Sequence, residues 1–139
     1  MKAHENILVF YKKLPTYNPQ KTFNHKRKVS TAEHKRNSKL SDNYNTYNLS
    51  SYDSTERYPR SIQKFKKDIQ KSKLHPTQKP VDLFEYLIKT YTNKDDMVLD
   101  NAAGSGTTGI ACRNLKRNCI MIEKEEKYCE IILNRLKMT

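Results

Sequence analysis

The residues best suited to bind a small ligand lie between Val98 and Glu123. The run Asp100-Asn-Ala-Ala-Gly-Ser-Gly-Thr-Thr108 follows a short apolar stretch and contains two of the chain's three glycines. Glycine lets the backbone turn sharply and approach a ligand, and a helix that begins there presents free N–H groups. This pattern is typical of the carboxyl end of a strand, where open α/β sheets bind their ligands.

The spacing of the glycines narrows the class of ligand. The pattern Gly-x-Gly lacks the third glycine of a dinucleotide site, and no Gly-Lys-Thr supplies a phosphate-binding lysine. Glu123 ends the next apolar run, where a carboxylate commonly accepts hydrogen bonds from ribose hydroxyls. An acidic residue in the first turn of a helix, favoured by the helix dipole, is the other interpretation. The order of strand, glycine turn, helix, strand and acid favours a nucleoside site.

A second polar segment, His75-Pro-Thr-Gln-Lys-Pro80, lies just before an amphipathic stretch. Two prolines fix an extended backbone and a helix start, so a rigid loop and cap is one interpretation. The segment also offers hydroxyl, amide and ammonium groups, which can bind a carboxylate of a ligand in the same pocket. The residues themselves leave both interpretations open.

The hydrophobic pattern predicts the elements that position these residues. After Pro80, apolar residues at helical spacing predict a helix over 80–92: Leu83, Phe84, Leu87, Ile88 and Tyr91. Beyond this helix we expect a buried strand over 97–100, a helix over 106–116, a strand over 119–123 and a helix over 125–137. Helices that alternate with short apolar strands are typical of a parallel, doubly wound α/β sheet.

The first half of the chain is less regular. Residues 5–12 form an apolar run rich in β-branched and aromatic residues, which predicts a buried strand. Residues 60–70 suit either a helix or an edge strand. Between about 16 and 58 no periodicity is sustained, so we expect a long functional loop or a segment that orders on meeting a partner.

Positive charge is concentrated in the same half. The 139 residues include 27 Lys and Arg against 15 Asp and Glu, a net charge of +12. Residues 1–74 carry a net +11 and residues 75–139 a net +1. This excess indicates a polyanionic partner. Basic residues mixed with tyrosines suit phosphates and bases, although a solvated flexible loop has the same composition.

Membrane and metal functions are not indicated. No apolar run approaches the roughly 18 residues of a membrane span, and the first residues lack a secretory signal, so we expect a cytoplasmic chain without membrane contact. Cys112, Cys119 and Cys129 lack the Cys-x-x-Cys spacing of zinc and redox sites, which indicates reduced, half-buried residues. The histidines show no metal-ligand pattern, and we predict no metal site.

Three motifs, by their order and spacing, resemble the carboxyl-terminal half of a site-specific DNA amino-methyltransferase: His75-Pro-Thr-Gln-Lys-Pro80, Leu99-Asp-Asn-Ala-Ala-Gly-Ser-Gly-Thr-Thr-Gly109 and Ile122-Glu123. The branch is the one whose catalytic half precedes its cofactor half. The run from His4 to Lys13 also resembles the strand that closes the catalytic half in that family.

The resemblance implies a partial Rossmann-like fold that uses S-adenosylmethionine as methyl donor. Residues 1–12 would form the terminal strand of the catalytic half, 13–74 a basic target-recognition region, and 75–139 the cofactor-binding segment. Adenine N6 is the preferred target and cytosine N4 the alternative. The implied cofactor-binding residues are Thr77, Gln78, Lys79, Asp100, Asn101, Gly104, Ser105, Gly106, Thr107 and Glu123. Contact with double-stranded DNA is expected through Lys26, Arg27, Lys28, Lys35 and Arg36.

Within this resemblance, the residues have different roles. Asp100, Gly104, Gly106 and Thr107 would line the methionine side of the cofactor. Glu123 would hold the ribose hydroxyls. The loop residues 77–79 would contact the amino-acid portion from the opposite side.

The sequence departs from the family in its catalytic motif. The family carries Asp/Asn/Ser-Pro-Pro-Tyr/Phe/Trp, and this sequence contains no Pro-Pro. An exocyclic amine is a poor nucleophile, so methyl transfer needs oriented acceptors for its protons and a base taken out of the stack. We therefore predict no catalytic residue here and expect the chain alone to be inactive. A truncated or split gene, or a separate polypeptide that supplies the catalytic half, would account for this, and a non-catalytic DNA-binding remnant or accessory subunit is the alternative function.

Overall fold

The computed structural model describes residues 4–31, 52–66 and 75–137 of the 139. The chain divides into two compact units, of which the first comprises Met1–Asn18 and Lys64–Thr139 and the second Pro19–Gln63. The basic region expected over 13–74 overlaps the second unit. All of the residues implied in cofactor binding belong to the first unit.

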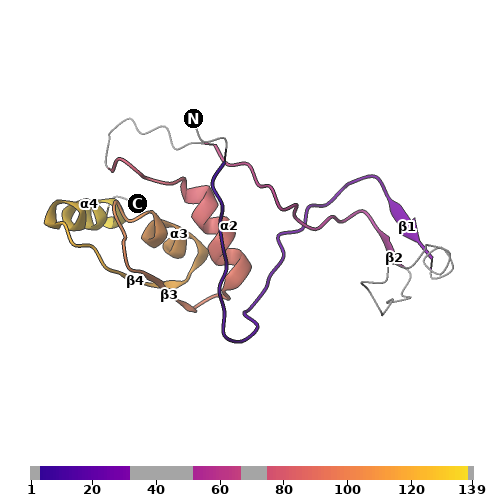
Figure 1. Cartoon of the computed structure of the whole chain (residues 1–139), viewed down its shortest axis with the longest axis horizontal. Helices are drawn as coiled ribbons and strands as arrows, with labels where there is room; N and C mark the ends of the chain where they lie inside the picture. Colours follow the sequence, from indigo (N-terminus) through magenta and orange to yellow (C-terminus); the bar gives the residue numbers. More distant parts are fainter. Residues whose placement is uncertain (1–3, 32–51, 67–74, 138–139) are drawn as a thin grey trace. The chain divides into compact units, whose positions relative to one another are not determined.

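The first unit contains α2 (Val81–Tyr91), β3 (Met97–Asp100), α3 (Thr107–Leu115), β4 (Asn118–Met121) and α4 (Glu126–Lys137), as Figure 1 shows. β3 and β4 pair in parallel, with Leu99 opposite Ile120. Because parallel neighbours need a crossover connection, α3 lies between them in the chain. The α/β fold and the five elements predicted between residues 80 and 137 are confirmed.

Local chemistry accounts for the helix ends. The extended backbone of Pro80, with φ −61° and ψ 139°, leads into α2. α3 is followed by Lys116, whose left-handed backbone (φ 58°) turns the chain toward β4. None of the helices among the described residues has the length and apolar character that crossing a membrane requires.

The core lies between the helices and one face of the β3–β4 pair. Ile88 of α2 and Ala111 and Cys112 of α3 are buried, and Val98 and Cys119 pack against them from the strands. Burial raises the pKa of the Cys112 thiol to about 12, so this side chain stays neutral and behaves as a small apolar residue. All three cysteines are free, and Cys119 and Cys129 are half-buried as expected. The expectation of a half-buried residue is wrong for Cys112, which is 1% exposed because α2 and the strands pack around it.

The opposite face of the two strands is exposed. The strand over 97–100 was expected to be buried, but Met97 is 60% and Leu99 62% exposed, and Ile120 of β4 is 50% exposed. Side chains alternate between the faces of a sheet, and among the described residues the helices cover only the face that carries Val98 and Cys119. The expectation is therefore wrong for this face of β3.

The buried strand expected over 5–12 is not formed. The segment lies beside α2 (Figure 1). Near its start, Lys79 Nζ forms an ion pair with the Glu5 carboxylate (2.8 Å). Farther along the chain, the Asn18 N–H donates to the Thr90 carbonyl (2.7 Å). Its side chains remain in solvent, with Leu8 73% and Phe10 85% exposed. An isolated strand leaves its backbone unpaired, and the described part of the chain provides no neighbouring strand for this segment. Residues 60–66 are neither helix nor strand, and 67–70 lie outside the described residues.

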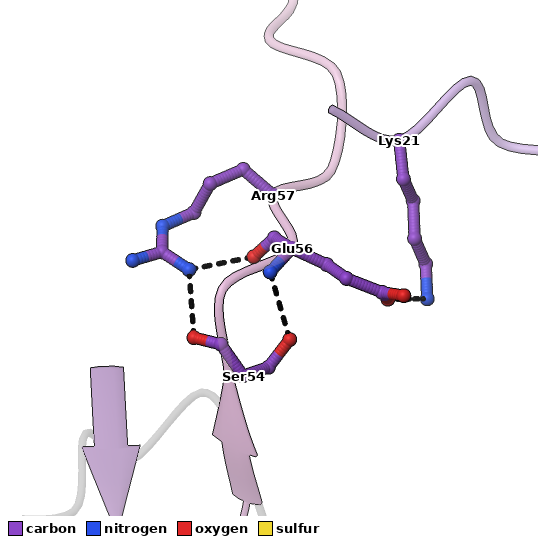
Figure 2. Close-up of polar contacts among 4 residues, drawn as sticks. All are labelled: Lys21, Ser54, Glu56 and Arg57. Atoms are coloured by element: carbon purple, nitrogen blue, oxygen red, sulfur yellow. Dashed lines mark hydrogen bonds and ion pairs between the residues drawn. The ribbon is translucent and has the colours of Figure 1, made fainter. Parts of the chain in front are cut away.

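The second unit contains a short antiparallel pair where no regular structure was expected. β1 (Lys28–Ser30) pairs with β2 (Tyr52–Ser54), and residues 32–51 lie outside the described part of the chain. Figure 2 shows the polar contacts beside β2. The Arg57 guanidinium donates to the Ser54 carbonyl (3.2 Å), and Lys21 Nζ pairs with the Glu56 carboxylate (2.9 Å). Across the pair, Arg57 also donates to the Lys26 carbonyl and Arg27 pairs with Asp53, so polar contacts accompany the ladder.

Candidate functional site

The glycine turn follows β3 and leads directly into α3. Gly104 and Gly106 have φ values of +53° and +78°, which side chains with a Cβ rarely adopt. A Cβ at Gly106 would also lie 2.9 Å from Ile132 of α4. The sequence prediction of a sharp turn is confirmed, and the second glycine additionally allows α4 to pack closely.

Asp100 holds the turn from its first residue. One oxygen of its carboxylate accepts the N–H of Ala102 at 3.1 Å, and the other accepts the hydroxyl of Thr108. Ala103, Ser105, Thr107 and Thr108 are buried, and within the described residues every buried side-chain polar atom has a hydrogen-bond partner. The turn is therefore ordered by the protein's own groups.

Glu123 connects the glycine turn to the segment after β4. Its carboxylate accepts the N–H of Gly104 at 2.7 Å with one oxygen and the N–H groups of Lys124 (2.8 Å) and Glu125 (3.0 Å) with the other. The Glu125 N–H, followed by the other two, holds the pKa of Glu123 below its usual value of 4.5, while desolvation opposes the shift. Glu123 precedes α4, which begins at Glu126, so the interpretation of Glu123 as a first-turn helix residue is wrong. Oε1 accepts two N–H groups and Oε2 one, which leaves one lone pair, on Oε2, for a ligand hydroxyl.

The structure places the His75–Pro80 loop against the glycine turn. Ser105 Oγ–H donates to Gln78 Oε1 at 2.9 Å, and Thr77 Oγ1 lies 3.1 Å from His75 Nδ1. The His75 ring lies 3.4 Å from the position of a Cβ on Gly104 and packs on Tyr128, with ring centroids 4.5 Å apart. The loop therefore lies beside the turn as well as leading into α2.

One cavity of about 370 Å³ lies between this loop, α2 and the glycine turn. Of the residues implied in cofactor binding, eight line it: Thr77, Gln78, Lys79, Asp100, Asn101, Gly104, Ser105 and Thr107. Gly106 and Glu123 are outside the lining. Gly106 lies against Ile132 of α4, and Glu123 accepts the N–H of Gly104. The volume is within the range of roughly 300–1,000 Å³ of small-molecule sites.

The apolar wall of this cavity was missed from the sequence. Phe84, Leu87 and Ile88 of α2, with Val98 and Leu99 of β3, also line it. The available signal was the apolar face of α2, which predicted a core. One helix face serves both purposes here, because the cavity is continuous with the core. A polar rim over an apolar wall suits a ligand with a charged end and a flat ring.

Lys79 is engaged within the chain. Its ammonium group lies 2.8 Å from both carboxylate oxygens of Glu5. A ligand carboxylate that bound Lys79 would therefore exchange with Glu5 or join it. The segment before α2 and the N-terminal segment are tied together by this pair, which no sequence pattern indicated.

The basic cluster of the second unit is partly neutralised by its own residues. Arg27 pairs with Asp53, and this guanidinium lowers the pKa of the Asp53 carboxyl. Lys26 and Lys28 are exposed, and within the described residues neither forms an ion pair. Lys35 and Arg36 lie outside the described residues. In the described part of this basic cluster, the side chains that are exposed and form no ion pair are therefore those of Lys26 and Lys28.

Among the described residues, no group of three or more His, Cys, Asp or Glu side chains is arranged to hold a metal ion. The titratable groups at the cavity are instead Lys79, Asp100 and His75. The chemistry that these residues support is the binding of a polar small molecule.

Comparisons with known proteins show what the sequence resembles. The family model N6_N4_Mtase, described as DNA methylase, matches residues 1–134. The Type II methyltransferase M2.MboI of Moraxella bovis is 51% identical over 61 residues, which are 44% of this chain and 22% of that protein. M.HinfI of Haemophilus influenzae is 42% identical over 71 residues, 51% of this chain and 20% of that protein. The matches span about a fifth of the length of these curated relatives.

A solved structure shares the fold. The cytosine-N4-specific PvuII DNA methyltransferase aligns with a TM-score of 0.51 at 25% identity, over 55% of this chain and 31% of that chain. The likeness covers only part of each protein. It supports the α/β architecture of the cofactor half.

We predict that Gly106→Ala lowers the free energy of unfolding more than Gly104→Ala. The left-handed backbone costs about 1–2 kcal/mol for a residue with a Cβ at either position, and only Gly106 adds the overlap with Ile132. Urea unfolding of both variants measures the difference. Adding Ile132→Ala to Gly106→Ala should cost less than the sum of the single changes, and equal losses for the two glycine variants would contradict the prediction.

We predict that Glu123→Gln makes stability less sensitive to acid. The folded-state pKa of Glu123 is below its ordinary value of 4.5, so its carboxylate stabilises the fold above that pH, and this contribution is lost as the pH falls through the lowered pKa. The variant should be less stable than the native chain at neutral pH and should converge with it in acid. Glu130→Gln, an exposed change on α4, is the control, and the same acid dependence in all three chains would exclude this role.

Proposed function

The chain belongs to the N6_N4_Mtase family of DNA methylases, and we propose that it holds S-adenosylmethionine and contacts DNA for a site-specific DNA amino-methyltransferase. One observation carries the proposal. Residues 77–79, 100–105 and 107, which are separate in the sequence, line the same cavity between α2 and the glycine turn. These are the residues implied by the motif resemblance.

The residues present fit this cofactor. The cavity combines the hydroxyl of Thr77, the amide of Gln78 and the carboxylate of Asp100 with an apolar wall from α2. The polar groups match the charged amino-acid portion of S-adenosylmethionine, and the wall matches an adenine ring. Glu123, two residues after β4, keeps one lone pair on Oε2 for a ribose hydroxyl while it orders the turn. When bound, the cofactor supplies the methyl group.

The chain's own residues bind and orient, and they do not activate the target amine. The motif that would accept the amine protons is absent from this sequence, so those acceptors must come from a catalytic segment outside these 139 residues. Adenine N6 is the preferred target and cytosine N4 the alternative. Mass spectrometry of nucleosides from DNA treated with the completed enzyme distinguishes N6-methyladenine from N4-methylcytosine.

Double-stranded DNA is the proposed substrate contact of the second unit. Lys26 and Lys28 are exposed on the hairpin, beside the Arg27–Asp53 pair. Their charges attract phosphates and add no sequence readout by themselves. Lys35 and Arg36 belong to the same basic stretch of the sequence, and their contact with DNA stays a prediction.

A non-catalytic DNA-binding remnant or accessory subunit is the second candidate. It is favoured by the engagement of two charged groups expected at the cofactor, because Lys79 is paired with Glu5 and Glu123 accepts three backbone N–H groups. Such a chain would bind DNA without S-adenosylmethionine. Calorimetry with the cofactor separates the two candidates.

We predict that the chain binds S-adenosylmethionine in isothermal titration calorimetry and that Asp100→Asn weakens binding at least tenfold, or about 1.4 kcal/mol. The amide removes one of the acceptors at the rim of the cavity. Asp96→Asn is the matched control, because Asp96 also accepts a backbone N–H (from Asn93, 2.7 Å) but does not line the cavity. Absence of binding by the native chain, with DNA binding retained, would favour the remnant.

We predict that DNA binding weakens steeply with salt and that the double variant Lys26→Gln/Lys28→Gln flattens this dependence. Each phosphate contact contributes about 1 to the slope of log K against log salt concentration, so the slope should fall by about 2. Lys94→Gln, which removes a lysine that pairs with Asp95 in the first unit, is the control. Fluorescence anisotropy on a labelled duplex measures the slopes, and an unchanged slope in the double variant would place the contacts elsewhere.

A further inference from the structure

The last turn of α4 carries a guanidinium group that is bonded to the glycine turn. Arg135 Nη1 donates to the Ser105 carbonyl and also to Ser105 Oγ, the latter at 3.1 Å. Ile132, three residues earlier and on the same side of the helix, lies against Gly106. α4 therefore contacts two successive residues of the turn, one through a cation and one through an apolar side chain.

The Ser105 hydroxyl connects this guanidinium to the ligand cavity. Ser105 is 3% exposed, and its Oγ–H donates to Gln78 Oε1 at 2.9 Å. Ser105 and Gln78 line the cavity, whereas Arg135 does not. We refer to Arg135, Ser105 and Gln78 as the polar row, which runs from α4 through the glycine turn to the His75–Pro80 loop.

The arginine sets the direction of the hydrogen bonds in the polar row. A guanidinium is always charged and has no acceptor, so it binds Ser105 Oγ at a lone pair of the oxygen. The hydroxyl hydrogen then points away from the cation, and the positive charge favours a carbonyl oxygen as the next group. Gln78 accordingly has Oε1 toward Ser105, and its amide nitrogen, which carries two N–H donors, is directed away from Ser105.

We propose that Arg135 is a positioning residue that acts through Ser105 to hold the Gln78 amide with its N–H groups toward the carboxylate of the cofactor's amino-acid portion. The identity of this ligand rests on the proposed function. The arrangement selects an anionic group, because a Gln78 amide turned the other way would present an oxygen to the carboxylate.

The charges at the cavity make this orientation important. The Lys79 ammonium is already paired with both carboxylate oxygens of Glu5, and Asp100 is an anion on the cavity lining that repels a carboxylate. A bound carboxylate therefore gains from neutral donors, of which the Gln78 amide has two.

The test compares two ligands by isothermal titration calorimetry: S-adenosylmethionine and decarboxylated S-adenosylmethionine, which differ only by the carboxylate. The native chain should bind S-adenosylmethionine more tightly. Arg135→Met should weaken S-adenosylmethionine binding about tenfold, the order expected for one hydrogen bond to a charged group, and should leave binding of the decarboxylated ligand unchanged. Weakening of both ligands equally, or of neither, would overturn the proposal and spare the proposed function.

A second variant tests whether Arg135 acts through Ser105. Ser105→Ala removes the middle of the polar row and should have the same selective effect on S-adenosylmethionine. The double variant Arg135→Met/Ser105→Ala should be little weaker than either single variant, because both changes interrupt the same connection. Fully additive losses would contradict the proposal. Circular dichroism confirms that each variant folds.

Arg113→Met is the matched control. The Arg113 guanidinium also binds α4, where it donates to the Leu136 carbonyl at 2.8 Å, but Arg113 does not line the cavity. This variant should leave the ratio of the two affinities unchanged. A basic residue in the last turn of a helix also interacts favourably with the helix dipole, but that role of Arg135 would affect stability and not the choice between the two ligands.

A spectroscopic measurement on the native chain remains decisive should a variant unfold. In heteronuclear NMR spectra, the side-chain amide signals of Gln78 should shift on addition of S-adenosylmethionine and shift markedly less with the decarboxylated ligand. Shifts of equal size would overturn the proposal. Failure of the native chain to bind either ligand would overturn the proposed function, and this inference with it.

Discussion

The hydrogen bond from the Gly104 N–H to the Glu123 carboxylate joins the ends of the two parallel strands, and the pocket depends on it. The bond can form because parallel pairing brings the carboxyl ends of β3 and β4 to the same edge. The same carboxylate accepts N–H groups of Lys124 and Glu125, just before α4. The glycine turn, the end of the sheet and the approach to α4 are thus held by one side chain, whose pKa is lowered as a result.

The ligand cavity and the exposed side of the β3–β4 pair meet at Leu99. Leu99 lines the cavity and is 62% exposed, so the cavity borders the exposed side of the β3–β4 pair. The polar side of the cavity is already ordered, because Asp100 and Gln78 have partners within the chain. The apolar side has a wall from α2 and an edge at the exposed strands.

Charge in the second unit serves structure as well as binding. Arg27 and Lys21 pair with Asp53 and Glu56, and Arg57 donates to backbone carbonyls. These contacts hold a hairpin that has too few apolar side chains to fold by burial. The net positive charge counted from the sequence is therefore larger than the charge that is available to bind phosphates. In the described part of the basic cluster, the charge that remains available belongs to the exposed Lys26 and Lys28.

The sequence by itself determined the helices and strands from α2 to α4, the sharp turn at Gly104 and Gly106, and the family. The helix and the turn are set locally, by the 3.6-residue apolar period of α2 and by the backbone freedom of glycine. The family is indicated by the order and spacing of three short motifs, which can be read directly from the sequence. The tertiary structure alone decided that Glu123 binds Gly104, that Lys79 pairs with Glu5 across 74 positions, and that residues 75–80 lie on the turn. It also decided that 5–12 stays exposed and that Met97 and Leu99 face solvent. Apolar composition predicts that a segment can be buried, but burial itself depends on which neighbours pack against it.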